Sequence, residues 1–534
     1  MENKFTRHRP LVAGNDWMIV SGSPFASQAG ADILKAGGNA VDAAIAANAV
    51  LGVVKPHMNG PGGDLFALVY MNDTGKVRAL NAGGRSPARA NCNALKGKGY
   101  DAIPEKGILS AIVPGAVHGW HDMSSRYGAL KFEALFERAI ELAKKGFPVY
   151  PELSDMICLE EKHLKLSDHA KAIFFKNGNP LQPGDRLIQK DLANSLDLIA
   201  RKGPDVFYQG TLGKTLVNFS DANNGFFTLA DLKNHRSTWS APITSEYRGY
   251  ELCTHPPNTQ GIAWLMTSNI VKAYDLNKLG HNSADYIHLI VEAKKLAFAD
   301  RDRYVCDPEF HDIPISDLLS QKHTKKQLEK INMKKAATQV TPGKFQSKGE
   351  DTVYLAVVDK HGNAVSLIQS LYEGFGSCAM IDGTGIFLHN RGRDFWMENN
   401  HINCLEPNKR PYHTLTPAMI LKHGKPVFVL GSPGADGQTQ TLTQVTANLI
   451  DFSANAQEAV EAPRWRSNPD NSLTMEKRFS PQVIEDLKAR GHKIDLRGDW
   501  DRICGGAQVI KIDRENHFLT SGADPRRQGY SMGY

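Results

Sequence analysis

The sequence predicts a layered α+β fold, in which sheets are covered by helices. Its main support is the segment from Thr352 to Leu371, where apolar residues run almost without interruption through two strands and a turn. A strand that is apolar on both faces must be covered on both faces, by a second sheet or by helices. Helical patterns at 26–54 and 282–308 precede this segment, and no internal repeat interrupts the series.

Residues 26–54 predict two helices. The pair Gly37-Gly38 is typical of the end of the first helix. Asn39 is a capping residue for the second helix, with Asp42 favourably placed in its first turn. The alanines of this second helix allow close approach to neighbouring elements, so we expect it to be buried.

The clearest helix pattern is 282–308, which has a broad apolar face and is expected to end at Pro308. The polar, lysine-rich tract from Gln321 to Glu350 is typical of a weak helix followed by a flexible linker. The section from about 130 to 240 is mainly helical in pattern. After Thr352 the sequence predicts helices near 438–451 and 481–490 and final strands around 507–519.

Composition excludes several classes of protein. The chain has 534 residues, 41% hydrophobic and 22% charged, which is ordinary for a globular protein with a sizeable core. The net charge of +6 is small, and the lysines are dispersed outside one tract, so no nucleic-acid partner is expected. No stretch has the ~18 apolar residues of a membrane span, so no membrane partner is expected either.

The number and spacing of the cysteines indicate the cellular compartment of the protein. The seven cysteines form no CxxC pair, which favours neither a disulfide framework nor a zinc ribbon. A reducing compartment fits this pattern best. The first residues contain no apolar core of a signal peptide, and the sequence therefore predicts a cytoplasmic protein.

Thr352 is a candidate nucleophile because a buried strand begins abruptly there, directly after a polar tract. A threonine hydroxyl needs a base beside it, and an α-amino group, with a pKa of about 7.7–8.0, is a suitable one. Cleavage between Asp351 and Thr352 would place that amine beside its own hydroxyl. The same hydroxyl can perform the cut by attacking the Asp351 carbonyl. Threonines also often simply begin strands, and these residues alone leave that interpretation open.

The wider sequence resembles the γ-glutamyltransferase family. "TVYLAVVDKHGNAVSLIQSLYEGFGS" is similar to the start of the small subunit in that family. Further motifs occur in family order along nearly the whole chain: "AGGNAVDAAIAANAVLGVVKPHMNGPGGD", "YRGYELCTHPPNTQG", "EAKKLAFADRDRYVCDP", "RPYHTLTPAMIL" and "GSPGADG". The resemblance implies an N-terminal nucleophile hydrolase with a four-layer αββα sandwich, formed by two subunits from one precursor.

The resemblance also implies roles for individual residues. Thr352 matches the nucleophile that autoprocessing exposes, and Ser370 takes the place of a threonine whose hydroxyl bonds to it. Asp394 in "NRGRDF" matches the aspartate that binds the α-amino group of a γ-glutamyl substrate. Gly434 and Ala435 match the pair whose backbone N–H groups form the oxyanion hole. Such donors are typically worth about 2.7–4 kcal/mol each.

The sequence departs from the family where γ-glutamyl transferases hold the substrate α-carboxylate. Their arginine aligns with Gly83, and Arg85 lies two residues further on. Their paired serines are replaced by His413 and Thr414, and an asparagine near the nucleophile is replaced by Tyr372. The segments "YHTLTPAM" and "GADGQTQT" look more like the acylase-like branch of the family, which includes cephalosporin acylase-like and oxamate amidohydrolase-like enzymes. Candidate anchors for a carboxylate in a different acyl group are Arg85, Arg391, Arg393 and His413.

The sequence therefore predicts an autoprocessed amidohydrolase or acylase that cleaves a small amide through an acyl-enzyme on Thr352, with glutathione hydrolysis or γ-glutamyl transfer as possible reactions. The alternative is an uncleaved, non-catalytic binding protein of the same fold. We expect a large subunit, 1–351, with a flexible tail over 321–351, and a small subunit, 352–534. The two subunits would associate, as one pair or as a dimer of heterodimers. No cofactor is expected, and no metal site, because the 19 histidines include no HExxH motif.

Overall fold

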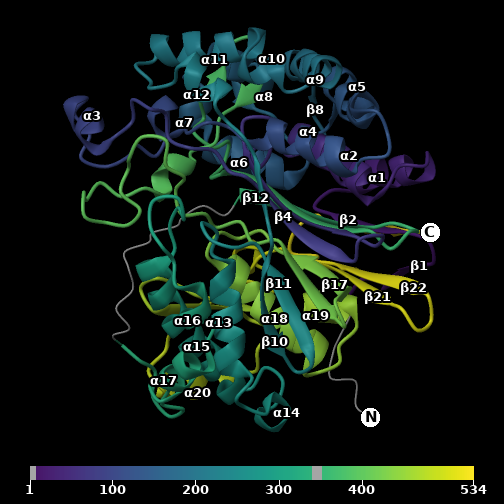
Figure 1. The fold of residues 1–534 in the computed structure, drawn as a ribbon, viewed down its shortest axis with the longest axis vertical. Coiled ribbons are helices and arrows are strands. Elements are labelled where there is room, and N and C mark those ends of the chain that lie inside the picture. The colour runs from purple at the N-terminus through teal and green to yellow at the C-terminus, as the bar shows by residue number, and fades with distance from the viewer. Residues whose placement is uncertain (1–7, 339–350) are drawn as a thin grey trace.

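The computed structural model describes residues 8–338 and 351–534 and has four layers, helix–sheet–sheet–helix (Figure 1). Two seven-stranded sheets stack face to face in the middle of the molecule, and each is covered by helices on its outer face. The predicted α+β class and the αββα sandwich are both confirmed.

Each sheet is antiparallel throughout and mixes strands from both ends of the chain. In the first sheet the order is β23 (Tyr530–Gly533), β2 (Met18–Ser21), β12 (Asp351–Val358), β13 (Ala364–Tyr372), β3 (Asp64–Met71), β4 (Lys76–Ala82) and β9 (Thr238–Ser240). In the second it is β1 (Val12–Gly14), β22 (Phe518–Ala523), β21 (Gln508–Asp513), β17 (Lys425–Gly431), β16 (Ala418–Lys422), β11 (Tyr250–Thr254) and β10 (Ile243–Tyr247). The predicted final strands correspond to β21 and β22.

The strand that begins at Thr352 occupies the centre of the first sheet. Side chains alternate along a strand, so Val353, Leu355 and Val357 pack toward the helices, whereas Tyr354 and Ala356 pack toward the second sheet. Both faces of β12 are therefore buried, which explains why its sequence is apolar almost throughout.

Helices α1 (Pro24–Lys35) and α2 (Ala40–Val54) cover the first sheet, as predicted for residues 26–54. The Asn39 side chain accepts from the backbone N–H groups of Val41 and Asp42, and the Asp42 carboxylate accepts from the Asn39 N–H. This reciprocal cap begins α2, and every residue of the helix is buried. Helices α4 (Ala116–Tyr127) and α5 (Glu137–Lys145) belong to the same layer.

The outer face of the second sheet is covered by α13 (Gly261–Val271), α15 (Ala284–Tyr304), α18 (Gly437–Ile450) and α19 (Ala456–Glu461). Helix α15 confirms the pattern at 282–308 but ends at Tyr304, before Pro308, because Val305 is extended. The predicted helices near 438 and 481 correspond to α18 and to α20 (Pro481–Ala489). Among the described helices, none combines the length and the apolar character needed to cross a membrane.

The tract from Gln321 begins with a helix, as predicted, and the chain that follows this helix packs against the rest of the protein. Residues 321–328 form helix α17 (Gln321–Leu328), and the chain after it packs on the second helical layer. Ala337 is held at both backbone atoms: its N–H donates to Glu292, and its carbonyl accepts from Lys295. The polar sequence after α17 therefore does not indicate a chain without contacts, because buried charged side chains of α15 bind the backbone of Ala337. Residues 339–350 lie outside the described residues.

Candidate active site

Thr352 and Ser370 face each other at the end of the central hairpin, on β12 and β13. Thr352 Oγ1 donates to Ser370 Oγ at 3.1 Å, and Ser370 Oγ in turn donates to the Asp351 carbonyl oxygen at 2.8 Å. The Tyr372 N–H donates to the same Ser370 oxygen at 2.7 Å. A short chain of hydrogen bonds thus leads from the threonine hydroxyl to the carbonyl of the peptide bond immediately before it.

A bulge in the hairpin creates this geometry. The pairing shifts between Asp351 and Thr352, so that Leu371 has no counterpart on β12 and its N–H binds the Met58 carbonyl instead, at 2.9 Å. Tyr372 then adopts φ +85°, in the left-handed region that few non-glycine residues occupy. Bulges commonly re-aim side chains beside active sites. Here the bulge lies between Ser370 and Tyr372, directly beside the Thr352 hydroxyl.

The turn between β17 and α18 contains Gly434 and Ala435, both at positive φ, +129° and +45°. Their carbonyls accept from the N–H groups at the start of α18, those of Gly437 at 2.7 Å and Gln438 at 3.0 Å. This arrangement fixes the turn, and the backbone at 434 requires glycine because other residues avoid φ +129°. Rigid backbone beside a helix N-terminus is suited to stabilising negative charge.

Gln260 was missed by sequence reasoning, although it is the second-last residue of the motif "YRGYELCTHPPNTQG". Its Nε2 donates to the carbonyls of Thr414, at 2.7 Å, and Ala435, at 2.8 Å. Its Oε1 accepts from Arg301 Nη1 at 2.9 Å, and Arg301 also binds Asp436. All these groups are buried. The network therefore holds the turn at Gly434 and Ala435 against the segment that contains Thr414.

Tyr372, Arg391 and Asp394 form one buried cluster. The Tyr372 hydroxyl donates to Asp394 Oδ1 at 2.7 Å, and Arg391 Nη1 donates to Asp394 Oδ2 at 3.0 Å and to Thr414 Oγ1 at 3.1 Å. The Arg391 guanidinium also lies over the Tyr372 ring, 4.1 Å from its centre. Burial raises the pKa of Asp394 to about 6, although Arg391 opposes the shift. Both carboxylate oxygens of Asp394 are therefore engaged by the protein itself.

His413 lies beside this cluster rather than free in a pocket. Its Nε2 is 3.1 Å from Oδ2 of Asp64, a buried carboxylate that also lies 3.4 Å from Arg391 Nε. Burial, together with the charge of Arg391, lowers the pKa of His413 to about 3, so the ring is neutral. Sequence reasoning missed Asp64, the last residue of "NGPGGD" and the first residue of β3, whose carboxylate compensates the charge of Arg391.

Two of the predicted anchors do not join the site network. Arg85 is only partly buried, and its guanidinium is paired with Asp307 at 3.3 Å and Glu309 at 2.6 Å. Arg393 is paired with Glu373 and, at 3.2 Å, with Glu105. Both charges are already compensated by neighbouring carboxylates. Of the arginines proposed from sequence, only Arg391 belongs to the cluster that surrounds Tyr372.

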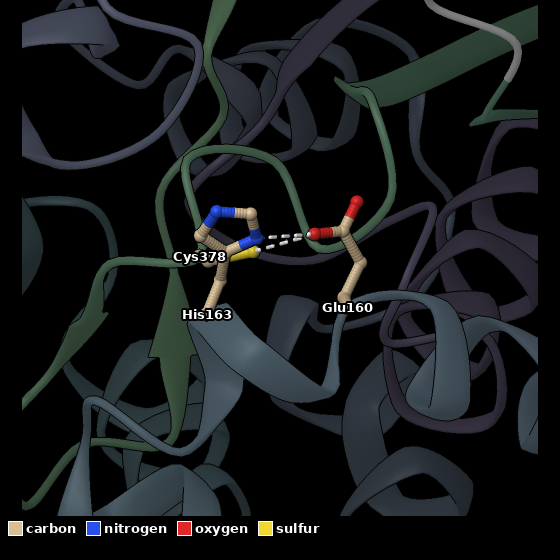
Figure 2. Close-up of side chains that lie close together, drawn as sticks. All are labelled: Glu160, His163 and Cys378. Carbon is tan, nitrogen blue, oxygen red and sulfur yellow. Dashed lines mark hydrogen bonds and ion pairs between the residues drawn. The ribbon is translucent and has the colours of Figure 1, made fainter.

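Ligand atoms for a metal ion come close together in two places among residues 8–338 and 351–534. One is Glu160, His163 and Cys378, shown in Figure 2, where the imidazole Nδ1 and the thiol both approach Glu160 Oε2, at 3.0 and 3.7 Å. Lys106 Nζ lies 3.0 Å from the other carboxylate oxygen, and burial raises the pKa of the Cys378 thiol to about 12. The ammonium already balances the carboxylate, and the thiol is neutral. The other group is His288, Glu292 and His492, where Glu292 is paired with Lys295 at 2.8 Å.

Comparison with known proteins agrees with this architecture. Residues 26–534 match the family described as gamma-glutamyltranspeptidase. The glutathione hydrolase-like YwrD proenzyme of Bacillus subtilis (strain 168) is 43% identical over 531 residues, 98% of this chain and 99% of that protein. The acylase ACY 1 proenzyme of Pseudomonas sp. (strain SE83) is 36% identical, over 98% of this chain and 95% of its own length. The crystal structure of cephalosporin acylase from Bacillus halodurans superposes with a TM-score of 0.93 at 36% identity, covering 100% of this chain and 98% of that one.

The stacked sheets between helical layers, together with these relatives, define an enzyme of the N-terminal nucleophile hydrolase class. More narrowly, the chain belongs to the γ-glutamyltranspeptidase family, as the sequence motifs predicted. It is an amidohydrolase or acylase of that family, made as a proenzyme and processed into a large and a small subunit that act on small amides.

Proposed function

We propose that the chain cleaves itself between Asp351 and Thr352 and that Thr352 is then the nucleophile of amide hydrolysis. The observation that carries this proposal is the hydrogen-bond chain from Thr352 Oγ1 through Ser370 Oγ to the Asp351 carbonyl oxygen. Consecutive hydrogen bonds therefore join the attacking hydroxyl to a group that can carry its proton, and that group to the carbonyl that is attacked.

Self-cleavage follows from this arrangement in two steps. Thr352 Oγ1 attacks the Asp351 carbonyl carbon and gives up its proton toward Ser370, while the Ser370 hydroxyl polarises the carbonyl oxygen. The C–N bond breaks, the nitrogen takes up a proton, and Asp351 is left as an ester on Thr352. Water then hydrolyses the ester. The products are a large subunit, 1–351, and a small subunit, 352–534, whose first residue carries a free amine.

The same residues serve the mature enzyme. The α-amine of Thr352 acts as the base for its own hydroxyl, which attacks a substrate amide to form an acyl-enzyme. The backbone N–H groups of Gly434 and Ala435 stabilise the oxyanion, and the rigid turn preorganises them. Water resolves the acyl-enzyme to a carboxylic acid. An amine acceptor in place of water would give acyl transfer.

For the substrate, we propose an acyl group that carries a carboxylate but needs no α-ammonium. Asp394, the residue that would bind an ammonium, is hydrogen-bonded at both oxygens by Tyr372 and Arg391. Arg391, by contrast, is fully buried, and its Nη2 has no hydrogen-bond partner among the described residues. A guanidinium edge of this kind is well suited to binding a carboxylate. The acylase relative and the cephalosporin acylase structure support an acylase reaction, while the YwrD relative makes glutathione hydrolysis the second candidate.

Three anilides test the substrate proposal. Glutaryl and γ-glutamyl anilides differ only in the α-ammonium, and a butyryl anilide lacks both charged groups. We expect kcat/KM for the glutaryl compound to exceed that for the butyryl compound by at least about tenfold, the value of ~1.4 kcal/mol of binding, and to equal or exceed that for the γ-glutamyl compound. A clear preference for the γ-glutamyl anilide would instead establish the glutathione hydrolase-like reaction.

Two further properties belong to the same proposal. The processed pairs assemble into a dimer of heterodimers, which light scattering of the purified protein tests, and the enzyme works in the cytoplasm, which fractionation of its native cells tests. Support for the second comes from the seven cysteines, all free thiols in the structure. The competing hypothesis, an uncleaved binding protein, predicts a single band on a reducing gel after long incubation.

A further inference from the structure

Cys92 and Cys404 lie next to each other although 312 positions separate them in sequence. Their Sγ atoms are 3.2 Å apart, and both side chains are buried, each about 4% exposed. Cys92 is the first residue of helix α3 (Cys92–Gly97), and Cys404 follows the segment that carries Asp394. No role in the site described above uses either thiol.

The surroundings hold the two thiols in this position. Both belong to a small apolar cluster that also contains Leu95, Phe226 and Phe395. The Asn91 side chain caps α3 and fixes the start of the helix at Cys92. On the other side, backbone hydrogen bonds between Trp396 and Leu405 and between Trp396 and Asn403 close the loop that presents Cys404. These contacts hold the backbone at both cysteines in place.

We propose that Cys92 and Cys404 form a disulfide under oxidising conditions and that this bond joins the large subunit to the small subunit. A disulfide needs an S–S distance of about 2.05 Å, so the sulfurs must approach by little more than 1 Å, which side-chain rotation can supply. The statement that the bond joins two subunits rests on the proposed cleavage at Asp351–Thr352. The pairing of the two thiols does not.

The reaction requires an oxidant from outside the protein. Each thiol gives up its proton and one electron, the sulfurs form one bond, and a small disulfide such as oxidised glutathione is reduced to two thiols. Diamide acts equivalently, because its N=N bond takes up the two protons and two electrons. Burial and the neighbouring Cys92 raise the pKa of the Cys404 thiol to about 12, so the reaction is expected to be slow at neutral pH and faster in mild alkali.

The bond would also restrain the candidate substrate site. Phe395, which packs in the same cluster as the two cysteines, directly follows Asp394. A covalent tie between α3 and Cys404 therefore restrains the C-terminal end of the segment that begins at Asp394. We expect the oxidised enzyme to differ from the reduced enzyme in KM more than in kcat.

The test compares gels of the processed protein with and without reductant. The protein is treated with diamide at mildly alkaline pH, its remaining thiols are blocked with N-ethylmaleimide, and it is denatured. We expect the two subunit bands to merge into one band of full-length mass without reductant and to separate again with dithiothreitol. The variants Cys92→Ser and Cys404→Ser should show two bands in both lanes. Cys158→Ser, which removes an exposed thiol, should still cross-link.

Peptide mass mapping of the non-reduced wild-type protein gives a readout that does not depend on the folding of any variant. A linked peptide pair containing Cys92 and Cys404 supports the proposal. Two separate bands after prolonged oxidation, or a cross-link that persists in Cys92→Ser, overturns it. If the reducing lane instead shows one uncut chain, the cleavage proposal fails, while the mapped peptide pair still decides the pairing of the thiols.

Discussion

The hydroxyl of Ser370 stands between Thr352 and the peptide bond that precedes it. It accepts a hydrogen bond from Thr352 Oγ1 at 3.1 Å and donates one to the Asp351 carbonyl at 2.8 Å. Because the Tyr372 N–H also binds this oxygen, Ser370 has every hydrogen-bonding position filled and a fixed orientation. The four predictions that follow concern this relay, the turn at Gly434 and the cluster around Arg391.

Replacement of Thr352 by alanine is expected to leave the chain uncut and inactive, because both the attacking hydroxyl and the later nucleophile are lost. Thr352→Ser keeps the hydroxyl and should still be cut, more slowly, because serine lacks the β-methyl group that restricts χ1. Reducing gels followed over time, with N-terminal sequencing of the small fragment, measure both. A Thr352→Ala protein that is still cut, or a wild-type fragment that begins at another residue, contradicts the assignment.

Ser370→Ala removes the relay while leaving the nucleophile in place. We expect self-cleavage to slow by about 10²-fold or more, the range typical of a lost proton-transfer group. Ser370→Thr retains the hydroxyl and is the matched control, expected to be cut at a rate close to that of the wild type. The rate constant for loss of the full-length band is the measurement. Equal rates for the alanine and threonine variants would show that the hydroxyl has no part in the cut.

Gly434→Ala should lower kcat while the chain remains folded. A Cβ at this position meets only Gly505 Cα, at 3.8 Å, so space is available, but φ of +129° is strained for alanine. Relaxation of that strain would turn the N–H groups of the turn, and loss of one oxyanion donor typically costs 10²–10³ in kcat. Gly437→Ala is the control, because its added Cβ makes ordinary contact with Arg466 at 3.6 Å, where φ is not positive. Similar kcat values for the two variants would contradict the role of the turn.

The affinity for an anionic substrate should change with pH through Asp394. Burial raises the pKa of this carboxyl to about 6, against the opposing effect of Arg391, so it takes up a proton as the pH falls from 7 to 5. Arg391 then loses one balancing charge and attracts a substrate carboxylate more strongly. We expect KM for the glutaryl anilide to fall by up to about tenfold over this range, with KM for the butyryl anilide unchanged.

Asp394→Asn isolates this effect, because the amide is neutral at every pH. In this variant KM for the glutaryl anilide should be low and independent of pH between 5 and 7. The stability of the fold should also change with pH. A carboxyl whose pKa is raised in the folded state destabilises the fold when it is ionised, so this destabilisation is relieved as the pH falls through 6. A KM that rises on acidification in the wild type would exclude a direct interaction between Arg391 and the substrate carboxylate.

Local patterns predicted the secondary structure well. The alternation of buried faces in β12, the cap at Asn39 and the helices after Gly437 all depend on residues a few positions apart, and the structure has each of them. The tract after Gln321 was predicted in part, because its helix, Gln321–Leu328, was expected but the packing of the chain after it was not. Its polarity suggested loose chain, but Glu292 and Lys295, more than 40 positions away, bind the backbone of Ala337.

The candidate site was predicted in part. The order of motifs identified Thr352, Ser370, Gly434 and Asp394 as candidate site residues. It could not indicate which arginine would lie beside them. Arg85 forms ion pairs with Asp307 and Glu309, which lie over 200 positions away in sequence. Gln260 and Asp64 lie inside recognised motifs, yet their roles depend on contacts with Ala435 and His413, which are 175 and 349 positions away in sequence.

The order of motifs in the sequence was enough to identify the family by resemblance, and the resemblance implied the sandwich fold. The position of the strand that begins at Thr352 follows from its own apolar pattern, which depends on neighbouring residues alone. The tertiary structure decided which charges are balanced. Arg391 Nη2 has no hydrogen-bond partner within residues 8–338 and 351–534, Arg85 and Arg393 do not join the site, and both oxygens of Asp394 accept hydrogen bonds. The physical reason is that charge compensation depends on distances between buried groups, and those distances are set only when separate strands and loops are packed together.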